Sequence, residues 1–283
     1  MAKLLLGKEV NASINEEIKA KVETLKAQNI TPTLGIIRIG EREDDIAYER
    51  GATKRCETLG VAYEKFLLPA DAEEEEVLKT IDQVNKSEKI HGVLLFRPLP
   101  KHLNEDKIVN ALAVEKDVDG ITDLSMAGVF MGKDMGYAPC TPSACMKVLD
   151  HYGIDCTGKK VVVIGRSLVI GKPVAMMLMK KNATVTVCHT KTVDMPGVCK
   201  GAEVLVAAAG VAKMVDKSFV ADGAVVIDVG INVDEDGNLC GDVDFEDVAE
   251  NASVCTPVPG GVGSVTTSVL AKHLLKAAKA RRA

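Results

Sequence analysis

The segment Lys159–Pro173, KKVVVIGRSLVIGKP, has the residue types best suited to binding an anion. The β-branched run Val161–Ile164 predicts a buried parallel strand. Gly165 allows a sharp turn, Ser167 offers a hydroxyl to unpaired N–H groups, and Gly171 suits the close packing of a following helix. A helix N-terminus behind a glycine turn favours a dinucleotide phosphate. Five residues separate the two glycines, unlike the usual G-x-G-x-x-G spacing, so an ordinary strand-to-helix turn stays open as an alternative.

The segment after the next predicted strand bears on which dinucleotide fits. That strand, Thr184–Cys188, is followed by His189–Thr192, HTKT. Folds selective for NAD often place Asp or Glu here for the ribose 2′-hydroxyl, and this chain has neither. Hydroxyl donors and the charges of Lys191 and Arg166 suit a 2′-phosphate, so we expect NADP, with NAD as the alternative. For His189, a place beside the adenosine phosphate or at the strand end is favoured over catalysis.

The bulk composition indicates a globular protein with two domains. The chain has 283 residues, of which 47% are hydrophobic, enough for two cores. A net charge of −5, a pI near 5.7 and the lack of Trp argue against nucleic-acid and acidic-membrane partners. Eight cysteines without metal-binding spacing, and no recognisable signal peptide, favour reduced thiols in the cytoplasm and no metal site. No segment is long enough to span a bilayer.

Strand and helix signals alternate along the first half, which predicts an α/β domain with a parallel sheet. We expect strands at residues 33–39, 62–68 and 92–96, and helices at residues 12–28, 45–59, 73–85 and 105–112. Asn11 and Asn104 are the expected N-caps of the first and last of these helices. The buried face of the first helix is expected to hold Ile14, Ile18, Val22 and Leu25.

The alternation restarts after a helix that is expected to begin at Thr141 and Pro142 and to end near Gly153. Strands are expected at residues 161–164, 184–188, 204–208 and 224–229, with an edge strand at 254–255. This pattern is typical of a Rossmann-like domain. We therefore assign residues 1–140 to a substrate domain, completed by a C-terminal helix within 265–283, and residues 141–264 to a dinucleotide-binding domain.

Several motifs occur together in a distinctive order along nearly the whole chain. They are GEREDDIAYERGATKRCETLG (40–60), RPLPKH (97–102), KDVDG (116–120), GRSLVIGKP (165–173), CHTKT (188–192), DVGIN (228–232) and TPVPGGVG (256–263). Together they resemble the methylenetetrahydrofolate dehydrogenase/cyclohydrolase family.

The resemblance implies a homodimer that oxidises 5,10-methylenetetrahydrofolate with NAD(P)⁺ in one-carbon metabolism. Hydrolysis of the methenyl product to 10-formyltetrahydrofolate usually follows. The oxidation asks mainly for positioning of the donor carbon against the nicotinamide. The hydrolysis must also move protons, so it needs an acid/base group within hydrogen-bond reach.

The family match also implies site residues. Tyr48 is expected to stack on the folate and to bond through its phenol, and Asp119 to accept from the pterin N–H donors. For Asp117 the expected role is bracing the loop. The remaining expected folate contacts are Arg97, Pro98, Leu99, Pro259, Gly260 and Gly261. The expected cofactor contacts are Gly165, Arg166, Ser167, Thr190 and Ile231.

One departure from the family concerns the active-site lysine, expected four residues after Tyr48, where this chain has Ala52. Lys54 lies roughly 200° further around the helix, at about 100° per residue. The glutamine common before the LPLP segment is replaced as well, by Phe96. We therefore expect the dehydrogenase to be kept and the cyclohydrolase to be weak or lost. In the alternative, Lys54, Arg55 or Arg97 reaches the same space, and Lys54 stays a catalytic candidate beside Tyr48 and Asp119.

A second departure is Ser264, where the family often has proline, and we expect it to loosen the glycine-rich loop before it. Two rival functions remain open. One is the full bifunctional enzyme. The other is a silent folate- or nucleotide-binding protein that kept the motifs and lost turnover.

Overall fold

The computed structural model describes residues 2–280 and divides them into two compact units. Residues 13–140 and 267–280 form the three-stranded unit, and residues 2–12 and 141–266 form the six-stranded unit. The expected α/β class with two domains is confirmed. Within residues 2–280, no helix has the length and apolar character needed to cross a membrane.

The three-stranded unit is built on a parallel sheet in the order β3-β2-β4. Strand β2 (Thr33–Ile39) lies between β3 (Ala62–Leu68) and β4 (Gly92–Leu95). Residues 34–39 of β2 are all buried, as expected for a central strand covered on both faces.

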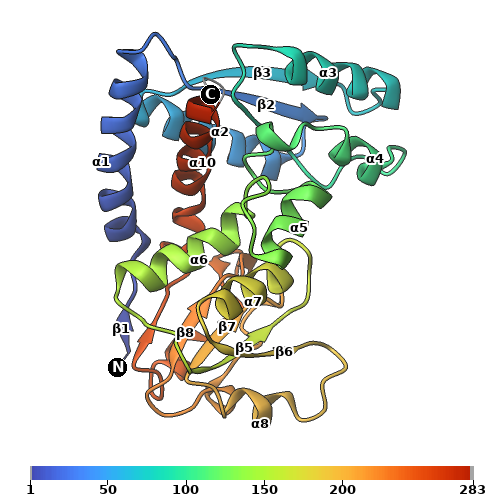
Figure 1. Cartoon of the computed structure of the whole chain (residues 1–283). Coiled ribbons are helices and arrows are strands. Elements are labelled where there is room, and N and C mark those ends of the chain that lie inside the picture. The colour runs from blue at the N-terminus through green and yellow to red at the C-terminus, as the bar shows by residue number, and fades with distance from the viewer. Residues whose placement is uncertain (1, 281–283) are drawn as a thin grey trace. The chain divides into compact units, whose positions relative to one another are not determined.

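Helices cover this sheet, and one of them, α2 (Glu43–Leu59), carries Tyr48. The helices of this unit are α2, α3 (Glu74–Lys86), α4 (Glu105–Asn110), the 3-10 turn η1 (Val114–Lys116), α5 (Asp123–Met131) and α10 (Thr266–Ala280). The unit also includes α1 (Gly7–Lys26) from residue 13 on. Helices α1 and α10 lie side by side (Figure 1), with Lys272 Nζ 2.8 Å from Glu17 Oε2. Asn104 caps α4 as expected, since its side chain accepts from the Lys107 N–H.

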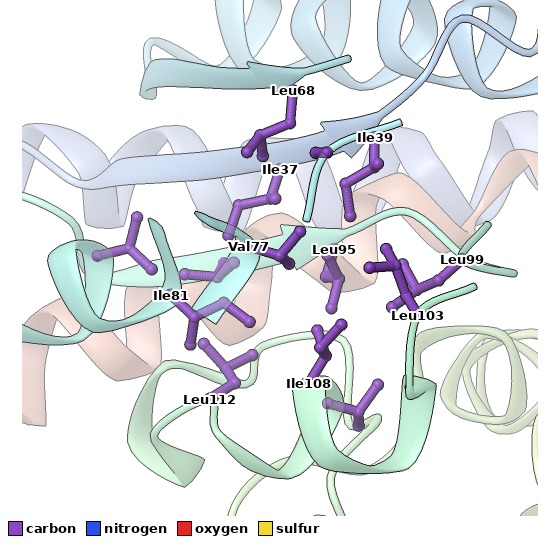
Figure 2. Close-up of a cluster of buried hydrophobic side chains, with 14 of the residues drawn as sticks. Ile37, Ile39, Leu68, Val77, Ile81, Leu95, Leu99, Leu103, Ile108 and Leu112 are labelled. Carbon is purple, nitrogen blue, oxygen red and sulfur yellow. The ribbon is translucent and has the colours of Figure 1, made fainter. Parts of the chain in front are cut away.

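A core of apolar side chains joins the sheet to α3 and α4, and Figure 2 shows its members pointing toward one another. The strands contribute Ile37, Ile39, Leu68 and Leu95, and the helical side contributes Val77, Ile81, Ile108 and Leu112. Leu99 and Leu103 belong to the same cluster (Figure 2). The segment around Leu99 is therefore anchored in the core, which fixes the polar residues that precede it.

The six-stranded unit holds a parallel sheet in the order β1-β11-β8-β7-β5-β6. The strands are β1 (Lys3–Leu4), β5 (Lys160–Ile164), β6 (Thr184–Cys188), β7 (Val204–Ala207), β8 (Val225–Asp228) and β11 (Val254–Cys255). Around them lie α6 (Cys140–His151), α7 (Gly171–Lys180), α8 (Met195–Cys199), α9 (Phe245–Val248), η2 (Lys217–Phe219), η3 (Val262–Ser264) and the hairpin β9 (Asn232–Val233) and β10 (Leu239–Cys240).

The N-terminal segment differs from the expectation. Helix α1 begins at Gly7, so Asn11 lies inside it rather than at its cap, and the Asn11 side-chain amide donates to the carbonyl of Ser264 at 2.8 Å. Residues 2–12 group with the six-stranded unit, whereas we assigned them to the first domain. The reason is that β1 pairs with β11, which makes β1 the edge strand and places β11 inside the sheet.

Two helices also differ from the sequence-based expectation. Helix α6 begins at Cys140, one residue before the expected cap Thr141, and α5 was not expected at all. The chain from Asp123 to Met131 leaves Leu124, Phe130 and Met131 exposed. Without a clean apolar face, it gives little periodic signal.

Candidate functional site

Helix α2 presents Tyr48 and places Ala52 and Lys54 on different faces. Its first turn carries acidic residues, which suit the positive end of the helix dipole, and it ends at Gly60 in the left-handed region (φ 71°). Tyr48 is 39% exposed, and its ring meets that of Phe96 edge to face, with centroids 5.7 Å apart. Ala52 is buried at 2% exposure, whereas Lys54 is exposed. Lys54 therefore does not point where a lysine at position 52 would.

A buried ion-pair network holds α2 on the sheet. Glu49, one residue after Tyr48, pairs with Arg38 of β2 and Lys65 of β3, both at 2.7 Å. Burial raises the pKa of Glu49, but the hydrogen bonds from Lys65 and Arg38 outweigh it and hold the pKa below its ordinary value. Glu49 therefore stays ionised and fixes the helix that carries Tyr48.

The loop after η1 carries Asp119 and is braced by Asp117. The Asp117 carboxylate is fully buried and accepts from the N–H of Ile121 at 2.9 Å. It also accepts from the N–H and hydroxyl of Thr122, at 2.8 and 2.7 Å. Asp117 thus has the bracing role expected of it, and Asp119 is only partly covered.

Asp119 has the electrostatic properties of a group that binds or transfers protons. Burial raises its pKa from 3.8 to about 6. The thiol and N–H of Cys140 donate to the carboxylate and oppose this rise, as does the positive charge of Arg97, while the charge of Asp117 adds to it. At neutral pH the group is ionised and accepts hydrogen bonds, and it takes up a proton slightly below neutrality.

The phenol of Tyr48 stays protonated beside this carboxylate. Burial and the negative charge of Asp119 raise the pKa of Tyr48. The side chain is 39% exposed, so solvent screening keeps this shift smaller than full burial would give. Tyr48 is therefore a hydrogen-bond donor rather than a base.

Cys140 and His273 form a support that the sequence reasoning missed. Cys140 Sγ lies 3.4 Å from the carbonyl of Val118 and 3.8 Å from His273 Nδ1. His273 Nδ1 lies 2.9 Å from the same carbonyl, next to Asp119 in the chain. From the sequence, the cysteines were expected only to be reduced thiols without a metal site. The available signal was a histidine among the apolar residues of the last helix.

The segment with Arg97, Pro98 and Leu99 is held by Glu105 at the start of α4. Arg97 Nη1 lies 3.6 Å from Glu105 Oε1, and the Leu99 N–H donates to Glu105 Oε2 at 2.9 Å. The Arg97–Pro98 peptide bond is cis, and the Pro98 carbonyl accepts from Arg42 at 3.3 Å. The Arg97 guanidinium is thereby placed where its charge acts on Asp119.

The turn between β5 and α7 forms a close-packed cradle. Gly165 has φ +119°, and a Cβ there would lie 2.1 Å from the carbonyl oxygen of Ala208. A Cβ at Gly171 would lie 2.1 Å from the carbonyl oxygen of Gly165. The Ser167 hydroxyl accepts from the N–H groups of Ile170 and Gly171 at 3.1 and 3.5 Å, as expected. The turn thus packs the backbone tightly at the start of α7, where Ser167 accepts from the first N–H groups, and Arg166 is exposed beside it.

The segment after β6 has donors and no carboxylate at the strand end. Thr190 and Lys191 are exposed, whereas His189 is engaged in the turn. Its N–H donates to Thr192 Oγ1 at 2.9 Å, and its Nδ1 accepts from the Lys191 N–H at 3.1 Å. These bonds match the interpretation of His189 as a strand-end residue.

The glycine-rich loop 257–264 is tied down. The Val258–Pro259 bond is cis, and Pro259 and Gly260 are exposed. Ser264 Oγ donates to the Gly261 carbonyl at 2.7 Å. The side chain of Ser264 closes the turn and its carbonyl accepts from Asn11, so the expected loosening of the loop has two hydrogen bonds against it and stays a prediction.

The expected site residues therefore fall into two groups. The three-stranded unit brings together Tyr48, Arg97, Pro98, Leu99 and Asp119. The six-stranded unit carries Gly165, Arg166, Ser167, Thr190, Ile231, Pro259, Gly260 and Gly261. Ile231 is a 65% exposed apolar side chain.

Comparison with known proteins identifies the family. The family model of the tetrahydrofolate dehydrogenase/cyclohydrolase catalytic domain matches residues 5–119, and that of its NAD(P)-binding domain matches residues 139–282. The "Bifunctional protein FolD" of Clostridioides difficile (strain 630) is 53% identical over 276 residues, covering 98% of this chain and 96% of that protein.

Similar solved structures agree with this family assignment. The bifunctional enzyme FolD from Campylobacter jejuni has 38% identity and a TM-score of 0.97, covering 99% of this chain and 100% of that one. The Trypanosoma brucei FolD, complexed with NADP cofactor and inhibitor, has 32% identity and a TM-score of 0.94, covering 99% and 98%. The chain belongs to the tetrahydrofolate dehydrogenase/cyclohydrolase family and contains its catalytic and NAD(P)-binding domains.

Proposed function

We propose that the protein oxidises 5,10-methylenetetrahydrofolate with NADP⁺ and hydrolyses the methenyl product to 10-formyltetrahydrofolate. The names of the relatives, which include both activities, favour this alternative over the expected loss of the cyclohydrolase. The observation that carries the proposal is the Asp119 carboxylate, set beside Tyr48 and Arg97 and ionised at neutral pH.

In the oxidation step the chain binds and orients. Asp119 accepts from the pterin N–H donors, and Tyr48 offers its ring face and phenolic O–H to the folate. The nitrogen lone pairs of the folate expel the hydride, and NADP⁺ supplies its acceptor. No protein base is needed for this step, so precise positioning is the main contribution of the protein.

The glycine turn after β5 fits the cofactor. The cradle at Gly165 leaves no space for a side chain, so its backbone is suited to a close approach by phosphate, and the positive end of the α7 dipole lies beside it. Arg166, Thr190 and Lys191 provide donors and positive charge for a 2′-phosphate. We therefore propose NADP as the preferred cofactor.

In the hydrolysis step a group must handle protons at neutral pH. Asp119, with a pKa near 6, is such a group in the three-stranded unit. Arg97 supplies charge but gives up no proton, because a guanidinium stays protonated in proteins. A carboxylate that holds the pterin N–H donors does not also move this proton, so Asp119 serves hydrolysis only in a complex in which it is released from the pterin.

A second candidate function is a dehydrogenase with slow hydrolysis, and Ala52 favours it. The position is buried at 2% exposure and has no ammonium group, while Lys54 is exposed on another side of α2. One measurement separates the two candidates. Purified protein is assayed for NADPH formation and for decay of methenyltetrahydrofolate, with the spontaneous decay subtracted.

The variant Ala52→Lys sharpens this test. If hydrolysis is slow for want of an amine, the substitution raises its rate on the order of tenfold or more, because a positioned acid/base group contributes about 10²–10⁴. Lys54→Ala is the control and should leave both rates unchanged. Brisk hydrolysis by the parent protein, with no gain in Ala52→Lys, rules out the second candidate. Oxidation absent with both NAD⁺ and NADP⁺ would contradict the proposed function itself.

We also propose a homodimer in the cytoplasm, from the family resemblance and the cysteines. All eight cysteines are buried free thiols. Sedimentation of the purified protein tests the dimer.

A further inference from the structure

Asp242 lies just after β10, in the GDVDF segment, which has no part in the two groups of site residues. Its side chain is fully buried, at 0% exposure. It accepts hydrogen bonds from the N–H groups of Ala209 (2.6 Å), Gly210 (3.0 Å) and Val211 (3.0 Å) and from the side-chain amide of Asn232 (2.9 Å). These donors come from two loops, one after β7 and one after β8.

Both carboxylate oxygens of Asp242 are used. An ionised carboxylate has about four acceptor positions, which these donors fill. Charge-assisted hydrogen bonds of this kind are about twice as strong as neutral ones. Asp242 therefore ties two separate loops together with its own negative charge.

Asp228, at the end of β8, fixes Asp242 in turn. Its carboxylate accepts from the N–H groups of Gly230 (2.9 Å), Asp242 (3.1 Å) and Val243 (3.0 Å). A Cβ at Gly230 would lie 2.2 Å from Asp242 Oδ1, and one at Gly241 would lie 1.8 Å from Asp228 Oδ2. Glycine at these two positions gives both carboxylates the space they need.

The two loops lie at the ligand edge of the sheet. Strands β5, β7 and β8 are neighbours and parallel, so their carboxyl ends share one edge, where nucleotides bind in such folds. The glycine turn after β5 touches Ala208, directly before the loop held by Asp242. In the same loops, the apolar side chains of Val211 and Ile231 are 51% and 65% exposed.

We propose that Asp242 is a positioning residue for the cofactor, holding the loops of Val211 and Ile231 as an apolar surface for a planar ring of the dinucleotide. The inference rests on the proposed function in taking NADP as the ligand. It adds a residue that touches neither cofactor nor substrate but sets the shape of the surface that does.

The test is Asp242→Asn in the full chain. Asparagine keeps the shape of the side chain but turns an NH₂ group toward N–H donors, so some of the hydrogen bonds that join the two loops are lost. The KM for NADP⁺ and the Kd for NADPH, read from its fluorescence, should each rise on the order of tenfold, since small misplacements cost up to about 10². The KM for folate and the kcat at saturating NADP⁺ should change less than about twofold.

Two further variants keep the test decisive if Asp242→Asn folds poorly. Asn232→Ala removes one donor and leaves Asp242 in place, so a smaller rise of the NADP⁺ KM, about threefold, is expected. Val248→Ala weakens the core of the six-stranded unit, where Val248 is fully buried, and should lower the active fraction without moving either KM. An unchanged NADP⁺ KM in Asn232→Ala and in soluble Asp242→Asn overturns the inference.

Failure of the inference can be told from failure of the proposed function. If the parent protein makes NADPH from methylenetetrahydrofolate and Asp242→Asn binds NADPH as tightly as the parent, the inference alone is wrong. If the parent makes no NADPH, the proposed function is wrong, and NADPH binding by parent and variants still decides the role of Asp242. A parent that binds no NADPH contradicts both.

Discussion

Asp119 in the three-stranded unit is partly covered and Asp228 in the six-stranded unit is buried, and the two carboxyl groups have different uses. Burial raises the pKa of each to about 6. The oxygens of Asp228 are occupied by N–H groups of its own loops. Asp119 instead accepts from Cys140 and faces the charge of Arg97 and the phenol of Tyr48. A raised pKa therefore indicates burial, and the bonding partners distinguish a group that serves a ligand from one that serves the fold.

The largest expected effect comes from Asp119→Asn. The change removes an ionised acceptor, so kcat/KM for folate should fall about 10- to 100-fold, the loss expected for a hydrogen bond to a charged group. The free energy of unfolding at pH 7 should stay the same or rise, because the ionised carboxyl is disfavoured by burial. Steady-state kinetics and urea unfolding on the same preparation check both.

The pH dependence of the parent protein sharpens this prediction. Asp119 accepts only while ionised, so the KM for folate should rise as the pH falls through about 6. In Asp119→Asn this rise should be absent. A variant with the parent's pH profile would mean that another group binds the pterin.

Residues near one another in the chain were predictable, and long-range partners were not. Strands β2, β3 and β6 have the expected bounds because each is rich in β-branched, aromatic or leucine side chains and lies between turn residues. Asn104 was identified as a cap because its bond spans three residues. The ties from Asn11 to Ser264 and from Cys140 to His273 join residues far apart in sequence. Asp242 was missed because backbone N–H groups leave no signal in the sequence.

The next effect concerns stability and tests the role of Asp228 in the same comparison. Asp228 binds its proton more tightly folded than unfolded, because its pKa is raised from 3.8 to about 6. Stability should therefore fall as the pH rises from about 4 to about 6, by on the order of 3 kcal/mol, and level off above. Asp228→Asn should lose this slope.

Asp119 contributes a slope of the same sign, so the comparison is made between variants. Urea unfolding midpoints are measured across this pH window for the parent, Asp119→Asn and Asp228→Asn. Each variant should lose part of the parent's slope, and only Asp119→Asn should lose folate affinity. An Asp228→Asn variant whose midpoint follows the parent's pH dependence over this window contradicts the assignment.

The smallest expected effect tests the support behind Asp119. His273 Nδ1 bonds the carbonyl of Val118, next to Asp119, and lies near Cys140. His273→Leu removes this tie and leaves a similar volume, so the KM for folate should rise about two- to tenfold, the loss of one hydrogen bond. The KM for NADP⁺ should not move, because Asp242 and the nucleotide loops belong to the other unit. A rise in both KM values would mean that His273 supports the whole fold rather than the folate side, and the two carboxyl regions would then not be independent.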